Sequence, residues 1–319
     1  MLEVRVSQKI IEADGVYSFE LLAANGDRLP GFTAGSHVDV QVAPGVTRQY
    51  SLCNSPEESH RYLIAVLHEP ASRGGSRGMH EQIEAGARLM IGQPRNLFDL
   101  DLTGERYLLF AGGIGITPIL AMAHALVAAG KDFELHYCGR SLGRLAFLDL
   151  LHGPLFGKQL RIHVDDGPAE QRLDAARLLA NPSATDQLYV CGPGGFMNHV
   201  QSTARACGWR DGQIHREDFT AQPQVQVQDG DRPFEIELAR SGRVLAIPAG
   251  QTVLDVLLAN AIDIDSSCEQ GICGACTTRV LSGEPDHRDQ FMTAAEHARN
   301  DCFTPCCSRS RSPRLVLDL

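Results

Sequence analysis

The nine residues CEQGICGAC, Cys268 to Cys276, carry three cysteines in the pattern Cys-x4-Cys-x2-Cys. A fourth cysteine, Cys306, follows after 29 intervening residues. Gly271 and Gly274 allow the backbone of this loop to fold tightly round a bound group, because glycine tolerates positive φ and close approach. The pattern predicts a metal centre whose ligands are Cys268, Cys273, Cys276 and Cys306.

Two kinds of metal centre use four thiolates. Structural zinc is bound tetrahedrally, and its ligands usually come as two short Cys-x2–4-Cys pairs. Here three ligands crowd one loop and the fourth stands alone, which is the ligand spacing of a 2Fe–2S cluster. A loop of this kind also directs several N–H groups at the sulfurs. We therefore expect a 2Fe–2S cluster, with a structural zinc site or disulfide bonds as the alternatives.

The cysteine loop resembles that of plant-type ferredoxins. The stretch GEPDHRDQFMT, residues 283–293, is similar to the segment that follows the loop in ferredoxin domains fused to oxygenase reductases. That resemblance places the last ligand shortly before a Ser-Arg pair, which leaves Cys306 and Cys307 as candidates, and we choose Cys306. Adjacent side chains on an extended segment point to opposite sides, so Cys307 is expected to pack as a free thiol.

Composition narrows the function classes. The 319 residues are 43% hydrophobic, as in an ordinary soluble protein with several cores, and the net charge of −10 disfavours nucleic acid as a partner. No secretory signal opens the sequence, and ten cysteines without one indicate a reducing compartment, so we expect a cytoplasmic protein. The stretch from Tyr107 to Gly130 is apolar enough to suggest a membrane span, but glycines and Pro118 interrupt it. We expect a buried strand, a glycine turn and a helix there, and no membrane association.

The chain divides into three expected domains. Residues 1–103 hold strand-like segments between turn-rich stretches, which favours a small antiparallel β-barrel. Residues 104–222 alternate strands and helices, which indicates an α/β domain with a parallel sheet. A polar linker then leads into residues 230–319, whose two strands, short helix and cysteine loop fit an α+β, ferredoxin-like (β-grasp) domain.

A strand of the expected barrel carries RQYS, residues 48–51. Alternation directs Arg48 and Tyr50 to one face and Ser51 to the other. A guanidinium suits phosphate and an aromatic ring suits a flavin, although such a strand can also be purely structural. The motif resembles Arg-x-Tyr-Ser of the ferredoxin–NADP reductase superfamily. That resemblance implies that Arg48 holds a flavin phosphate, Tyr50 lies along the flavin ring and Ser51 sits near flavin N5.

Two further elements are assigned to the flavin. Gly74, Gly75 and Ser76 would place backbone amides and a hydroxyl near the same phosphate, unless they form only a surface loop. Their tract is similar to that of the phthalate dioxygenase reductase branch, which implies FMN rather than FAD. Phe219 ends the second domain, and the resemblance implies that it covers the flavin face on which the nicotinamide stacks; a core phenylalanine is the alternative.

Two glycine elements follow strands of the second domain: GGIGITP at 112–118 and CGPGGFM at 191–197. Glycines let a dinucleotide approach closely, and a helix N-terminus favours its phosphates. Both elements match forms found in the same superfamily, which implies that Thr117 and Cys191 lie beside the nicotinamide. The remaining residues expected to bind this cofactor are Gly112, Gly113, Gly115, Arg140, Gly192 and Pro193.

The order flavin barrel, nucleotide domain, ferredoxin resembles the phthalate dioxygenase reductase and vanillate demethylase reductase family. Membership implies an NADH-dependent reductase with FMN and a 2Fe–2S cluster, which serves a separate Rieske-type oxygenase. Arg140 could bind either the 2′-phosphate of NADPH or the ordinary pyrophosphate. Asp165 and Asp166 would repel a 2′-phosphate near them, so we favour NADH. A reductase for a haem or diiron oxygenase, and a redox carrier or sensor without turnover, are the alternatives. The residues expected to act in catalysis are Ser51, Thr117, Cys191 and Phe219.

Overall fold

The computed structural model describes residues 1–69, 72, 74–219, 231–266, 271, 274–289 and 292–319. The chain forms two compact units. The first comprises Met1–Val42 and Gln49–Thr220, and the second comprises Ala43–Arg48 and Ala221–Leu319. The predicted ligands Cys268 and Cys273, and most of the predicted linker, lie outside the described residues. The domain boundaries given above stay predictions.

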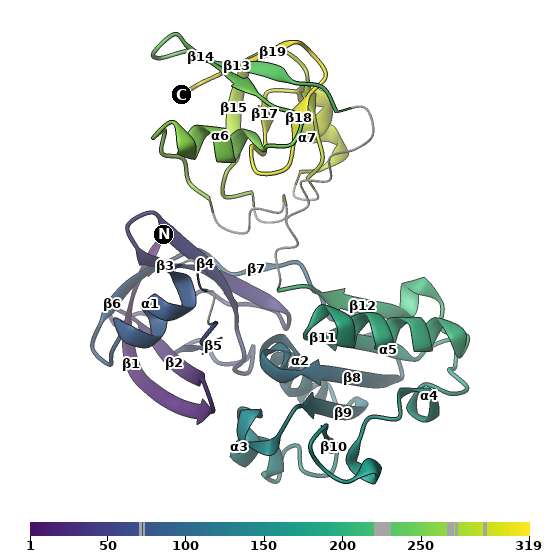
Figure 1. The fold of residues 1–319 in the computed structure, drawn as a ribbon. Coiled ribbons are helices and arrows are strands. Elements are labelled where there is room, and N and C mark those ends of the chain that lie inside the picture. Colours follow the sequence, from purple (N-terminus) through teal and green to yellow (C-terminus); the bar gives the residue numbers. More distant parts are fainter. Residues whose placement is uncertain (70–71, 73, 220–230, 267–270, 272–273, 290–291) are drawn as a thin grey trace. The chain divides into compact units, whose positions relative to one another are not determined.

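Seven strands form the first sheet, in the order β4-β3-β6-β1-β2-β5 with β7 paired to β3. An antiparallel bridge between Leu52 and Ile64 joins the residue after β4 to β5, so the sheet closes on itself. The predicted antiparallel barrel is therefore confirmed (Figure 1). Its elements are β1 (Leu2–Ala13), β2 (Val16–Ala23), β3 (Ser36–Ala43), β4 (Val46–Ser51), β5 (Tyr62–Leu67), α1 (Gly75–Glu81), β6 (Arg88–Ile91) and β7 (Arg95–Asn96).

A parallel sheet of five strands follows, in the order β10-β9-β8-β11-β12. Strands are added on one side of β8 and then on the other, which creates a switch point between β8 and β11. The strands are β8 (Arg106–Gly112), β9 (Asp132–Gly139), β10 (Leu160–Val164), β11 (Gln187–Cys191) and β12 (Ile214–Glu217). The helices that connect them are α2 (Ile116–Ala128), α3 (Leu148–His152), α4 (Ala175–Leu178) and α5 (Gly194–Ala206).

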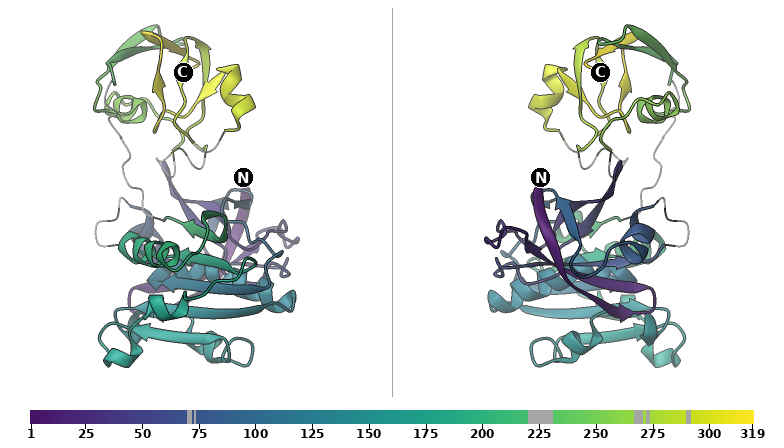
Figure 2. Two further views of the ribbon diagram at one scale, coloured as in Figure 1. Left: turned by 90° about the vertical axis from the view of Figure 1, so that its right-hand side faces the viewer. Right: turned by 90° about the vertical axis from the view of Figure 1, so that its left-hand side faces the viewer.

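Alternate residues of β8 serve two different cores. Tyr107 and Leu109 are buried with apolar residues of α2, and that core continues to Val16 and Phe98 of the barrel. Leu108 and Phe110 face the other way and are buried with residues of α4 and α5. Figure 2 shows the ribbon of the chain from two further sides. Because every second residue of a strand faces the same side, burial on both faces requires the continuous apolar run YLLFA. The barrel and the parallel sheet are thus joined by one core.

The apolar stretch from Tyr107 to Gly130, which is long enough to suggest a membrane span, contains most of β8, the 3-10 turn η1 (Gly113–Gly115) and α2. This agrees with the predicted strand, turn and helix. Among the described residues, no helix is both long and apolar enough to cross a bilayer.

The second unit contains a five-stranded sheet in the order β14-β13-β19-β15-β17. Val253 and Leu257 of α6 pack against this sheet. Thr252 begins α6, because its hydroxyl accepts a hydrogen bond from the N–H of Asp255 at 3.0 Å. The elements are β13 (Phe234–Leu238), β14 (Arg243–Ile247), α6 (Val253–Ala259), β15 (Thr278–Ser282), β16 (Pro285–Asp286), α7 (Ala294–Arg299), β17 (Cys302–Phe303), β18 (Arg309–Ser310) and β19 (Arg314–Leu317).

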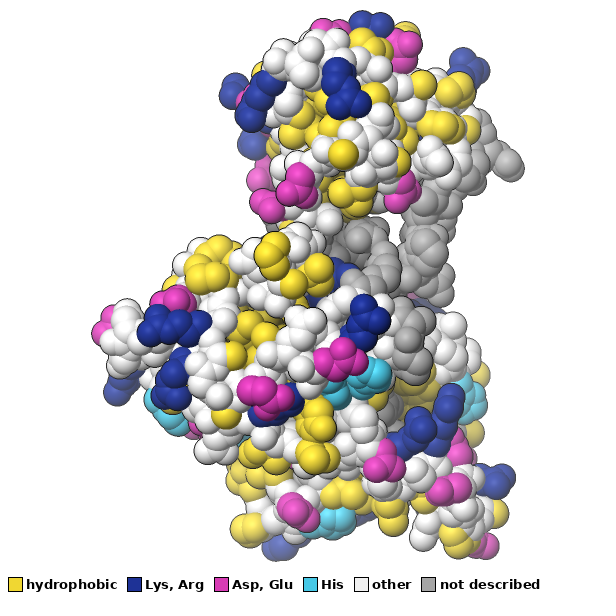
Figure 3. Space-filling view, turned by 60° about the vertical axis from the view of Figure 1, so that its left-hand side comes forward, with side chains coloured by type: hydrophobic (Ala, Val, Ile, Leu, Met, Phe, Trp, Pro, Cys, Tyr) yellow, Lys and Arg dark blue, Asp and Glu magenta, His cyan; other side chains and the backbone are white. Residues whose placement is uncertain are grey.

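Charged side chains of both signs are interspersed on the face that Figure 3 shows. Exposed ion pairs in the described part of the chain include Arg88 with Glu3 at 2.9 Å and Arg205 with Asp211 at 2.8 Å. Exposed pairs of this kind add little to stability, so the barrel and sheet cores carry most of it.

Candidate active site

The two glycine elements meet at the switch point of the parallel sheet. Cys191, the last residue of β11, is in register with Ala111 of β8. A Cβ on Gly115 would lie 2.2 Å from the carbonyl oxygen of Cys191, and one on Gly192 would lie 2.8 Å from the Cα of Gly112. Only glycine permits this approach, which lets both turns sit at the carboxyl edge of the sheet where α/β proteins bind nucleotides.

The same turns leave room for a ligand. A Cβ on Gly113 or Gly194 would meet no atom within 4 Å. Gly113 precedes α2 and Gly194 begins α5, and both helices have 13 residues. The first N–H groups of such helices lack partners within the helix and favour a phosphate. The structure therefore brings together Gly112, Gly113, Gly115, Gly192 and Pro193 in a cradle that suits a dinucleotide.

Thr117 and Cys191, the residues expected beside the nicotinamide, are both buried. The Thr117 hydroxyl donates to the carbonyl of Ile114 at 3.0 Å, which closes the turn that begins α2. Burial, together with the nearby carboxylate of Glu217, raises the pKa of the Cys191 thiol well above its ordinary value. Cys191 is therefore a neutral thiol at the floor of the cradle and not an activated nucleophile.

Glu217 completes this floor, although sequence reasoning gave it no role. It ends β12 in register with Cys191, and its carboxylate accepts a hydrogen bond from Ser51. Burial and the neighbouring Asp218 raise the pKa of Glu217 to about 8, while the Ser51 hydrogen bond opposes the rise. Its Oε2 atom is buried and has no hydrogen-bond partner among the described residues. A buried carboxyl group with a spare oxygen is uncommon, which makes Glu217 a candidate functional residue.

The only sequence signal for Glu217 was an acidic residue between a buried strand and Phe219. Phe219 is 42% exposed, which is unusual for a phenylalanine and is inconsistent with a core role. Arg140 follows β9 and is exposed at the carboxyl edge of the same sheet.

Strand β4 presents the flavin motif as predicted. Arg48 and Tyr50 are half-buried, whereas Ser51 is buried. In the second flavin element, Gly74 adopts a left-handed conformation with φ of 91° and precedes α1. Gly75 and Ser76 form the first turn of that helix, and the Ser76 hydroxyl accepts a hydrogen bond from the N–H of Glu69 at 3.1 Å. The motif on β4 offers a guanidinium, an aromatic ring and a hydroxyl, and the turn at Gly74 offers backbone amides and a hydroxyl. These are donor types that suit FMN, and the assignment of both segments to one flavin site stays a prediction.

Two of the four predicted cluster ligands are described, and they lie together. Cys276 and Cys306 are each 4% exposed and pack with Leu254. Hydrogen bonds with Cys276 and Cys307, and then burial, raise the pKa of the Cys306 thiol. The fold thus brings together two thiols that are 30 positions apart in the sequence. Thiolates are the ligands that hold an iron–sulfur cluster.

Cys306 and Cys307 do not lie on an extended segment as predicted. Residues 305–307 form a turn rather than an extended segment, so side-chain alternation does not apply to them. The Cys307 thiol is hydrogen-bonded to Cys306 and lies 3.2 Å from the Thr304 hydroxyl. The choice of Cys306 stays a prediction that now rests on its contact with Cys276 and on the family resemblance.

Comparison with known proteins decides the family. Residues 236–311 match the family described as 2Fe-2S iron-sulfur cluster binding domain. The whole chain is 54% identical over 319 residues to the entire vanillate O-demethylase oxidoreductase of Pseudomonas sp. strain HR199. It is 56% identical over 320 residues to that of Pseudomonas putida, again over the full length of both. The chain belongs to the vanillate O-demethylase oxidoreductase family.

A solved structure supports the same family. It is that of phthalate dioxygenase reductase, described as a modular structure for electron transfer from pyridine nucleotides to [2Fe-2S]. Its TM-score is 0.74 at 37% identity, and the match covers 100% of this chain and 98% of that one. As a member of this family the protein is an oxidoreductase that passes electrons to an oxygenase component, and the predicted cofactors FMN, NADH and a 2Fe–2S cluster are confirmed at the level of the family.

The type of oxygenase varies among relatives. A phthalate 4,5-dioxygenase reductase subunit from Pseudomonas putida is 40% identical over 99% of this chain. A haem-dependent oxidative N-demethylase beta subunit from Ectopseudomonas mendocina is 39% identical over 100% of it. An oxygenase partner is thus common to the family, whereas its metal centre is not.

Proposed function

We propose that the protein is the reductase component of an aromatic O-demethylase with a Rieske-type oxygenase, and that the aromatic acid is vanillate. End-to-end identity of 54–56% with two vanillate O-demethylase oxidoreductases carries this proposal. Substrate binding and oxygen activation then belong to the oxygenase, because this chain supplies nucleotide, flavin and cluster sites.

Ser51, Cys191 and Glu217 define the hydride-transfer position in this proposal. Cys191 gives the nicotinamide ring a neutral, apolar contact surface. Because the pKa of its thiol is raised, no thiolate forms beside the position where hydride is transferred. Glu217 is protonated below about pH 8 and shares a hydrogen bond with Ser51, so a proton can be held beside the flavin N5 position. Thr117 fixes the first turn of α2, and Phe219 covers the flavin until the nicotinamide displaces it.

Arg48, Gly74, Gly75 and Ser76 hold the FMN phosphate, and Tyr50 lies along the flavin ring. When bound, FMN accepts a hydride from NADH and releases electrons singly to the cluster. Cys268, Cys273, Cys276 and Cys306 ligate that cluster, which passes each electron to the oxygenase.

Acidic residues beside Arg140 support NADH as the donor. Asp165 and Asp166 follow β10, and their N–H groups donate to the carbonyls of Gly139 and Arg140, each at 3.1 Å. Two acidic residues therefore flank the edge where an adenosine ribose would lie, and they would repel a 2′-phosphate. Replacing both by serine should raise kcat/KM for NADPH relative to NADH.

Reconstitution tests the proposal directly. Purified reductase is mixed with a Rieske-type vanillate oxygenase, NADH and vanillate, and demethylated product and formaldehyde are measured. Formation of both in proportion to NADH oxidised is expected. NADH-dependent reduction of ferricyanide without any support of this oxygenase would contradict the assigned partner.

A reductase for a haem oxygenase is the second candidate, and the haem-dependent N-demethylase relative favours it. Its lower identity, 39%, makes it the weaker assignment. Steady NADH oxidation with cytochrome c or ferricyanide would also separate either reductase from a carrier or sensor without turnover.

A further inference from the structure

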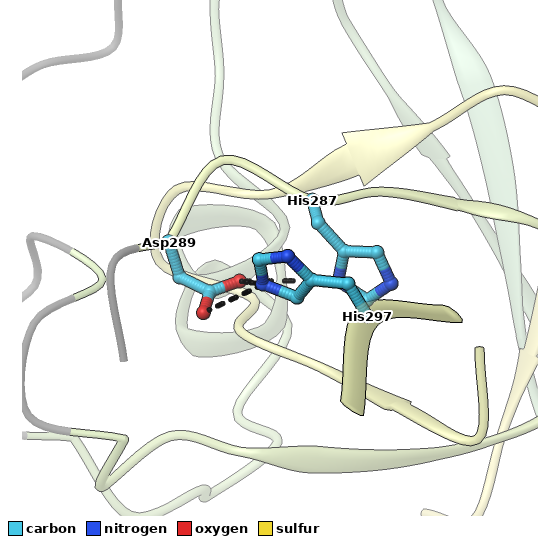
Figure 4. Close-up of side chains that lie close together, drawn as sticks. All are labelled: His287, Asp289 and His297. Atoms are coloured by element: carbon cyan, nitrogen blue, oxygen red, sulfur yellow. Dashed lines mark hydrogen bonds and ion pairs between the residues drawn. The ribbon is translucent and has the colours of Figure 1, made fainter. Parts of the chain in front are cut away.

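Three side chains with metal-binding atoms gather in the second unit, apart from the cluster cysteines. His287 and Asp289 follow β16, and His297 lies on α7 (Figure 4). Their ligand atoms all lie within 4.8 Å of one another, and within the described part of the chain no other group of three or more His, Cys, Asp or Glu does so. The Asp289 side chain is fully buried, and those of His287 and His297 are 9% and 28% exposed.

His287 directs a buried lone pair into this group. Its Nε2 lies 3.2 Å from the Asn300 amide oxygen, which can only accept, so Nε2 carries the proton. Nδ1 is then an acceptor, and it has no hydrogen-bond partner among the described residues. It faces Asp289 Oδ1 at 3.8 Å. Two buried acceptors that face each other favour a cation between them.

The separations match those of ligands on one small ion. Two ligands about 2.1 Å from a tetrahedral metal lie about 3.4 Å apart. Asp289 Oδ1 is 3.8 Å from His287 Nδ1. His297 Nε2 is hydrogen-bonded to the Asp289 carboxylate, 3.2 Å from each oxygen, and a bound metal ion would replace this hydrogen bond. The two imidazole rings are stacked, with centroids 4.4 Å apart and planes at 17°, so His297 must turn for both lone pairs to meet one ion. Its partial exposure on a short helix permits that turn.

Supporting contacts hold the proposed ligands in place. The N–H of Met292 donates to Asp289 Oδ2 at 2.8 Å, which fixes the carboxylate. Asn300, which orients His287, adopts a left-handed conformation with φ of 52° at the end of α7. A metal-bound histidine characteristically donates its other ring N–H to a fixed acceptor, as His287 does to Asn300.

We propose that His287, Asp289 and His297 bind one Zn²⁺ ion at a site distinct from the iron–sulfur cluster. Two imidazoles and one carboxylate form a ligand set that zinc accepts, with a water in the fourth position. The site borders the cysteine loop, because a Cβ on Gly271 would lie 2.9 Å from the Cα of Asp289. The ion is structural, because it links His287 and Asp289, which follow β16, to His297 on α7.

Zinc binding to the intact holoprotein, with flavin and cluster in place, tests the site. After mild chelation and addition of Zn²⁺, we expect one zinc per chain in addition to the cluster iron. Zinc-edge X-ray absorption should show only nitrogen and oxygen neighbours at about 2.0–2.1 Å, with imidazole scattering. His297→Gln should abolish stoichiometric binding. Asn300→Ala should weaken binding about 10- to 100-fold, because it removes a supporting contact outside the ligand set.

His199→Gln, a change of an exposed histidine on α5, is the matched control and should bind zinc like the wild type. Retained flavin and cluster absorbance shows that each variant is folded. The proposal is overturned by equal zinc affinity of wild type and His297→Gln, by a wild type that takes up no zinc, or by sulfur neighbours near 2.3 Å, which indicate cysteine coordination.

Discussion

Cys191 and Glu217 lie opposite each other in register where β11 and β12 end, and the Glu217 carboxylate also accepts a hydrogen bond from Ser51. Three segments that are distant in sequence thus meet at one buried point. The neutral thiol and the carboxyl group of raised pKa make this point sensitive to pH.

Glu217→Gln should remove a pH dependence of stability. The folded-state pKa of about 8 lies above the ordinary 4.5, so the native protein binds this proton more tightly than the unfolded chain. Wild-type stability should therefore fall as pH rises from 4.5 to 8 and then level off. The loss is on the order of 5 kcal/mol. Denaturant unfolding between pH 5 and 9 measures it.

In that experiment the stability of Glu217→Gln relative to the wild type should increase as the pH rises. Glu170→Gln, a change of an exposed residue, is the control and should follow the wild type. Parallel pH profiles for wild type and Glu217→Gln would show that Glu217 is not the buried acid described here.

Gly115→Ala should damage the nucleotide cradle. Its Cβ would collide with the carbonyl of Cys191 at 2.2 Å, so α2 must move away from the end of β11. We expect a loss of about 1–3 kcal/mol in stability and a clear rise in KM for NADH. Gly212→Ala is the matched control, because its Cβ also meets nothing within 4 Å and Gly212 lies outside the nucleotide cradle. Equal thermal midpoints and equal KM values for the two variants would contradict the proposed close packing.

Cys273→Ser should separate the two halves of the electron path. Hydride transfer to the flavin and ferricyanide reduction should stay near wild-type rates, while turnover with the oxygenase is lost, because the cluster follows the flavin. Stopped-flow flavin reduction and oxygenase turnover are measured on the same preparation. Loss of ferricyanide reduction in a variant that retains its flavin would contradict a serial path.

Cys306→Ser should lose the cluster or change its electron-paramagnetic signal, because a serine alkoxide is a harder ligand than a thiolate. Cys307→Ser should keep the visible spectrum and the iron content. Both single variants and the double variant are compared, because the two thiols lie in one turn and hydrogen-bond to each other. The opposite result for the single variants would assign the ligand to Cys307.

Much of the fold follows from local sequence patterns. The segments VYSFELLA and LRIHV became β2 and β10 with the expected bounds. Strand alternation and glycine turns act over a few residues, so they can be read locally. The meeting of GGIGITP and CGPGGFM also follows, because each ends a parallel strand at the same edge of the sheet.

Other features depend on packing between distant segments. The raised pKa of Glu217 results from burial, and its hydrogen-bond partner Ser51 lies 166 positions earlier in the chain. No local sequence pattern predicts either feature. The turn at residues 305–307 replaced an expected extended segment. No local pattern predicts that His287, Asp289 and His297 lie together, because their proximity depends on the position of α7.

Anaerobic titration with NADH, followed by absorbance and electron-paramagnetic resonance, tests the central claim that electrons pass from NADH through a flavin to a 2Fe–2S cluster within this chain. We expect one flavin and two cluster irons per chain, bleaching of the flavin by NADH, and a reduced 2Fe–2S signal that integrates toward one spin per chain. Flavin bleaching with no cluster signal, or metal analysis that finds zinc at the cysteines and no acid-labile sulfide, would contradict it.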